Sequence, residues 1–102
     1  MKTGKEPPAP APAPAPAQYY TGTASLVWNA VTGSTVSGYR VYYGTTSGKY
    51  QQSLGAGNWV GTATSFNLTG LLTGTTYFFA VTAVDSQGNE SAFSNEASKL
   101  VN

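Results

Sequence analysis

Few side chains in this sequence could carry acid or base chemistry. Its 102 residues include no histidine and no cysteine, and the four carboxylates are Glu6, Asp85, Glu90 and Glu96. Paired acid and base catalysis needs two carboxylates held at a defined separation in a pocket. Asp85 and Glu90 instead flank one short polar segment, which is typical of an exposed hairpin. The sequence therefore predicts that the chain is not an enzyme and has no catalytic residue.

The same segment offers the best oxygen ligands for a metal. Asp85, Asn89 and Glu90 could in principle ligate calcium, but they lack the dense spacing of a calcium loop and are more typical of turn formers. Without histidine and cysteine, the commonest metal ligands and all disulfides are excluded. We expect neither a metal nor a cofactor.

Phosphate and nucleic-acid binding are not indicated either. Residues 44–50, GTTSGKY, look superficially like a phosphate-binding loop, but no Ser or Thr follows Lys49 and no helix is expected there. The basic residues are scattered rather than gathered on one face. No apolar run approaches the ~18 residues of a membrane span. We expect no nucleic-acid partner and no membrane insertion.

Aromatic residues offer the one candidate contact surface. Alternation along residues 36–43 and 77–83 places Arg40 and Tyr42 on the outward face beside Phe78, with Trp59 and Tyr50 nearby. An exposed aromatic patch often marks a contact with another protein, domain or subunit, or with a polysaccharide. The alternative is an ordinary cross-strand pair with no ligand.

The elements that position these residues are strands. From Ala24 onward the apolar residues recur with period two, and turn signals follow every 8 to 12 residues, which predicts an antiparallel sandwich. Strands are expected near residues 24–29, 36–43, 50–53, 64–68, 77–83 and 93–101. Trp28 and Tyr39 are expected to face the core.

One local pattern predicts how the sandwich closes. The string Leu68-Thr-Gly-Leu-Leu-Thr-Gly-Thr-Thr-Tyr-Phe-Phe79 reads as a strand end, a corner and the start of a buried strand. Tyr77 is placed to hydrogen-bond back onto the corner's backbone, and Leu71 lies within the corner. This is the arrangement called the tyrosine corner.

The front of the chain differs from the rest. All six prolines lie in residues 7–16, and Pro and Ala alternate from Pro8 to Ala17. We expect residues 1–17 to be a linker or arm and residues 18–102 a domain. The arm is either an extended polyproline spacer or a strand that pairs through its alanine edge and leaves a proline edge that no strand can join.

Several strings together resemble the fibronectin type III domain in its bacterial form, over about residues 23–101. They are WNAV from Trp28, GYRVYYG from Gly38, LTGLLTGTTY from Leu68 and AVDSQGNES from Ala83. The resemblance implies an all-β, seven-stranded immunoglobulin-like sandwich, here preceded by the Pro-Ala arm. The departure is the first strand, which is short, irregular or supplied by the arm.

The resemblance also implies a role. It favours a non-catalytic spacer or protein-binding module of a bacterial secreted or surface protein, located outside the cell or on its surface. One alternative is a structural subunit of a surface filament, with the Pro-Ala arm making contacts between subunits. Another is a carbohydrate-binding accessory module.

Overall fold

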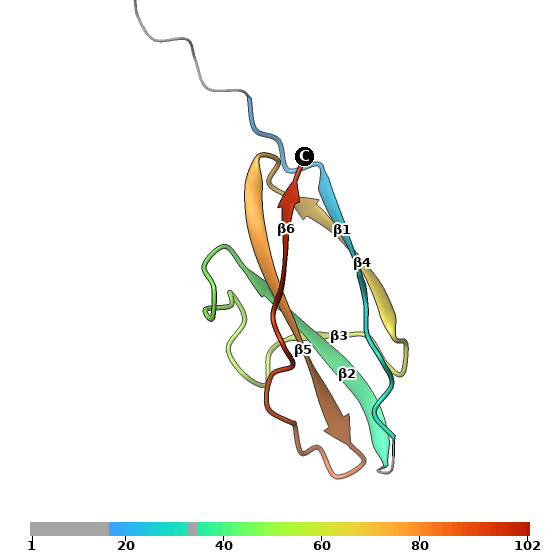
Figure 1. Ribbon diagram of the computed structural model, residues 1–102. Helices are drawn as coiled ribbons and strands as arrows, with labels where there is room; N and C mark the ends of the chain where they lie inside the picture. The colour runs from blue at the N-terminus through green and yellow to red at the C-terminus, as the bar shows by residue number, and fades with distance from the viewer. Residues whose placement is uncertain (1–16, 33–34) are drawn as a thin grey trace, which may run out of the picture.

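The computed structural model describes residues 17–32 and 35–102, and within these ranges it holds six strands and no helix. The strands form two sheets, one with the order β1-β4 and one with the order β3-β2-β5-β6, and all neighbours are antiparallel (Figure 1). The strand bounds are β1 (Gly22–Val27), β2 (Val36–Gly44), β3 (Asn58–Trp59), β4 (Ser65–Leu71), β5 (Thr75–Asp85) and β6 (Ala97–Val101). The all-β prediction is confirmed.

The core lies between the two sheets, and the period of two places it there. Inward residues alternate with outward ones along each strand, so each strand contributes one apolar face. The buried cluster consists of Ala24, Val41, Leu68, Leu71, Tyr77, Phe79 and Val101. Leu26, Trp28 and Val81 pack against this cluster while remaining partly exposed. Each fully buried large side chain contributes about 1.5–3 kcal/mol.

The predicted tyrosine corner is present. The Leu72 N–H donates to Tyr77 Oη at 3.0 Å, and both Leu71 and Tyr77 are buried. Gly70 and Gly74, on either side of the corner, have φ near +70°, a conformation that glycine adopts at little cost. The corner therefore joins β4 to β5 with its backbone satisfied.

Two predicted strands are placed differently. Residues 50–53 form no strand; the short edge strand that pairs with β2 is β3, further along the chain. The last strand begins at Ala97 rather than near Phe93. The Phe93 ring instead lies over the outer face of the sheet against Tyr42, with 4.9 Å between ring centroids.

Two serines pair with β5 where the last strand does not. Ser91 Oγ accepts the Ala83 N–H and donates to the Ala92 carbonyl, while Ser94 Oγ accepts the Val81 N–H and donates to the Asn95 carbonyl. All four distances are 2.9–3.0 Å. Each hydroxyl thus takes the place of a strand carbonyl, and the segment can leave the sheet without orphaning β5 donors.

Both ends of the described domain lie at one pole. The Thr73 N–H donates to the Tyr19 carbonyl, and the next N–H, from Gly74, donates to the Val101 carbonyl. Figure 1 shows the chain before β1 and the C-terminus at the same end of the sandwich. The predicted Pro-Ala arm lies outside the described residues except for Ala17. In the described part of the chain, no helix is long and apolar enough to cross a membrane.

Candidate contact surface

The outer face of the larger sheet brings the predicted contact residues together. Arg40 and Tyr42 alternate along β2, and β3 places Trp59 directly across from Arg40. Phe78 comes from β5, where it is the cross-strand partner of Gly44. Tyr50 follows the turn after β2 and approaches Tyr42, with 6.4 Å between ring centroids. The five residues therefore share one face, but they are not equally exposed.

The prediction that Tyr42 is exposed is wrong, since its side chain has an exposed fraction of 0%. Two irregular segments, whose apolar residues do not alternate, cover the Tyr42 ring. Gly57 lies so close to the ring that an added Cβ would be 2.6 Å from it. Phe93 packs edge-on against the other side. Tyr42 thus anchors a second, smaller core on the outer face instead of contacting a partner.

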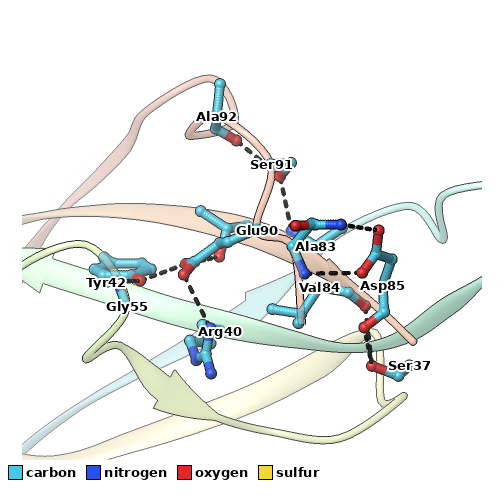
Figure 2. A network of polar contacts seen from close by, with 12 residues as sticks. Ser37, Arg40, Tyr42, Gly55, Ala83, Val84, Asp85, Glu90, Ser91 and Ala92 are labelled. Carbon is cyan, nitrogen blue, oxygen red and sulfur yellow. Dashed lines mark hydrogen bonds and ion pairs between the residues drawn. The ribbon is translucent and has the colours of Figure 1, made fainter. Parts of the chain in front are cut away.

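Glu90 is the hub of a partly buried polar network on this face. Its Oε1 accepts from Arg40 Nη1 at 2.9 Å, and its Oε2 accepts from Thr82 Oγ1 at 2.5 Å and from the Tyr42 hydroxyl. The Gly55 N–H donates in turn to Tyr42 Oη at 2.9 Å. Figure 2 shows the carboxylate pointing between Arg40 and Tyr42. The network fastens the segment after β5 and the loop before β3 onto the sheet.

The ionisation of Glu90 reflects this environment. Burial, which leaves the side chain 9% exposed, opposes the charged form and is the largest single influence on its pKa. The hydrogen bonds from Thr82 and Tyr42 and the charge of Arg40 together outweigh burial, so the pKa of Glu90 lies below its ordinary value. The carboxylate is therefore a structural anion at neutral pH, not a general acid.

Asp85, the other carboxylate of the predicted hairpin, has a separate role. Its Oδ1 accepts the N–H groups of Asn89 and Gln87 at 2.8 and 2.9 Å, which lowers its pKa. It therefore forms the turn, as the sequence predicts. Across residues 17–32 and 35–102, no three acidic side chains gather as a metal ligand set would.

A second anchor holds Tyr50. Glu96 accepts from the Tyr50 hydroxyl at 2.7 Å, from Ser47 Oγ at 2.5 Å and from the Gly48 N–H at 2.8 Å. Partial burial, the hydrogen bond to Glu96 and its negative charge raise the pKa of Tyr50 to about 12. The Tyr50 ring lies 5.0 Å from that of Phe93. Tyr50 is thus fixed by the chain itself.

Trp59 remains the prominent exposed aromatic of the predicted set. Its side chain is 52% exposed, and Arg40 Cζ lies 5.7 Å from the ring centroid, within the range of a cation–π contact. The ring edge packs against Gly38, where any Cβ would overlap it. Trp59 is therefore exposed and at the same time held in place from two sides.

Of the residues expected to be structural, Tyr39, Leu71 and Tyr77 are buried, and Trp28 packs against the core while remaining partly exposed. Trp28 and Tyr39 pack edge to face at 5.8 Å between centroids, and Tyr39 Oη accepts the Val31 N–H. Sequence reasoning missed Glu90, Phe93 and the two serines as elements of the outer face. The available signal was the spacing of Glu90, Ser91 and Ser94, three polar side chains within the five residues 90–94, between β5 and β6.

The family comparison agrees with this architecture. The model of the family described as fibronectin type III domain matches residues 12–99. No curated protein and no solved structure matches the chain.

Proposed function

Because the chain belongs to the fibronectin type III domain family, we propose that it acts as a protein-binding module whose contact surface is centred on Trp59 and Arg40. Domains of this family are commonly non-catalytic units for protein interaction or spacing, and they are frequent in extracellular proteins. We place this one outside a bacterial cell or on its surface, and we extend the domain proper over residues 18–102.

The observation that carries the proposal is the fixed exposure of Trp59. An exposed tryptophan loses little conformational freedom on binding when its ring is already held, and tryptophan and arginine dominate the binding energy of protein interfaces. The Glu90 network holds Arg40 beside the ring. Leu54 is also exposed and adjoins Gly55, which donates to Tyr42 in that network.

A protein partner fits this surface better than a sugar. Carbohydrate stacking needs a free aromatic face, and the Arg40 guanidinium occupies one face of the Trp59 ring. A guanidinium and an indole side by side suit an acidic or aromatic side chain of a protein.

A photocrosslinking experiment tests the proposal. A photoreactive phenylalanine replaces Trp59 in one variant and the exposed Thr62 in a matched control, and both are incubated with surface proteins of the producing cells. We expect one discrete product from position 59 only, competed by excess parent protein but not by Trp59→Ala. Equal products from both positions would contradict the surface. Trp59-dependent retention on insoluble polysaccharide would replace the protein partner with a sugar.

A further inference from the structure

The smaller sheet has a free edge beside an apolar groove. Within the described residues β1 pairs with β4 and with no other strand. A groove of about 380 Å³ follows this edge, lined on one side by Leu26, Val27 and Trp28 and on the other by Phe79, Val81 and Ala97. Val27 is 82% exposed, and the inward-facing Leu26 and Trp28 are only partly covered. The edge therefore has room and apolar surface for one more strand.

The backbone of β1 shows which groups the edge presents. The Trp28 N–H donates to the Thr64 carbonyl, next to β4, at 2.9 Å. Because strand groups point alternately to the two edges, the N–H and C=O of Ser25 and Val27 point the other way, to the free edge. At the upper end, Lys99 Nζ on β6 approaches the Thr23 carbonyl at 3.4 Å. The open stretch thus begins at Ser25.

We propose that this edge binds the alternating Pro-Ala segment, residues 8–16, of a second copy of the chain as an added antiparallel strand. Alternation gives the segment a single hydrogen-bonding edge, with every N–H on an alanine. Nine extended residues span about 30 Å, more than the roughly 16 Å from Ser25 to Asn29. The segment is therefore long enough to cover the open stretch.

The face of each side chain supports the same pairing. In an antiparallel ladder, hydrogen-bonded partners project their side chains to the same face. Alanines bonded to Ser25 and Val27 would lie on the outer face with them. The prolines between the alanines would then enter the groove and pack on Leu26 and Trp28, where apolar surface is open. The prolines would leave an outer edge without N–H donors, which limits assembly to one added strand per edge.

The path of the described chain favours a second copy over the chain's own arm. Tyr19 donates to Thr73 Oγ1 at 2.9 Å and accepts the Thr73 N–H at 2.8 Å, so the chain before β1 is tied toward the corner after β4. The end of β6 also occupies the start of the β1 edge, because Val101 packs against Gly22 and Lys99 Nζ approaches the Thr23 carbonyl. An arm leaving this way reaches the β1 edge of a neighbour, and repetition of the contact builds an open chain of copies.

The absence of cysteine in the sequence permits a direct test by disulfide trapping. Cysteine replaces Ala11, Ala13 or Ala15 in one set of full-length variants and Val27 in another, with Thr62→Cys as the exposed control. When a protein with a cysteine in the arm is mixed with the Val27→Cys protein under mild oxidation, we expect disulfide-linked dimers. Their yield should be at least tenfold higher than in a mixture of the same arm variant with Thr62→Cys. An Ala13→Cys, Val27→Cys double variant that closes internally as a monomer would overturn the proposal, as would the absence of any arm-to-Val27 disulfide.

Sedimentation of proteins without added cysteine provides the second readout. The parent should associate as its concentration rises. A variant with Ala9, Ala11, Ala13 and Ala15 all changed to proline keeps an extended arm but loses its donors, and it should remain monomeric. Equal association of parent and variant would overturn the pairing. Trp59 takes no part in the proposed contact between the arm and the β1 edge. The Trp59→Ala variant should therefore associate as the parent does.

Discussion

Single side chains close this fold, and the tyrosine corner is the simplest case. Tyr77→Phe keeps the buried ring but leaves the Leu72 N–H without its acceptor. We expect a loss of about 1 kcal/mol or more in the free energy of unfolding, because an unsatisfied buried donor costs about that much. Urea denaturation measures the change, with the exposed Tyr20→Phe as the matched control. An unchanged midpoint would show that the hydroxyl contributes nothing.

Glu90 makes the free energy of unfolding depend on pH in the acidic range. Its pKa is lowered in the folded state, so it contributes stability that is present above its ordinary value near 4.5 and is lost as pH falls through the lower folded value. Glu90→Gln should therefore cost about 1.5–3 kcal/mol at pH 7, the usual contribution of hydrogen bonds to a charged group. The difference between parent and variant should shrink below pH 4.5.

Urea titrations of both proteins at pH 7, 5 and 3.5 measure this difference. Comparing the pair matters, because Asp85 and Glu96 also have lowered pKa values and destabilise both proteins in acid. A difference that stays constant from pH 7 to 3.5 would mean that the Glu90 charge has no part in the network.

At the scale of elements, the sequence predicts the features that depend on the alternation of apolar and polar residues along a strand. The inward faces of β1, β2 and β5 follow from period two, and the corner follows from a local string, so both could be predicted. The contacts that cover Tyr42 on the outer face of the larger sheet could not be predicted. Glu90 lies 50 residues from Arg40 and 48 from Tyr42, and no periodicity reports a contact between an irregular loop and a distant strand.

The start of the last strand was missed for a related reason. Residues 93–101 alternate acceptably for a strand, but Ser91 and Ser94 already satisfy β5 through their hydroxyls. Their own N–H groups donate to the Ala83 and Val81 carbonyls, so this stretch is held to β5 at two points, and a continuous strand ladder begins only at Ala97. Hydropathy ranks a serine as a neutral surface residue, whereas here the hydroxyl substitutes for the backbone of a strand.

For the whole molecule, the two ends of the described domain lie at the same pole. The strand β5 alone spans about 36 Å at ~3.3 Å per residue, so ends at opposite poles would be at least that far apart. Tyr19 and Val101 instead accept from the adjacent residues Thr73 and Gly74. Dyes on cysteines replacing Ala17 and Asn102 should therefore report a separation well below 36 Å. A separation of about 36 Å or more would contradict the shared pole of the two ends.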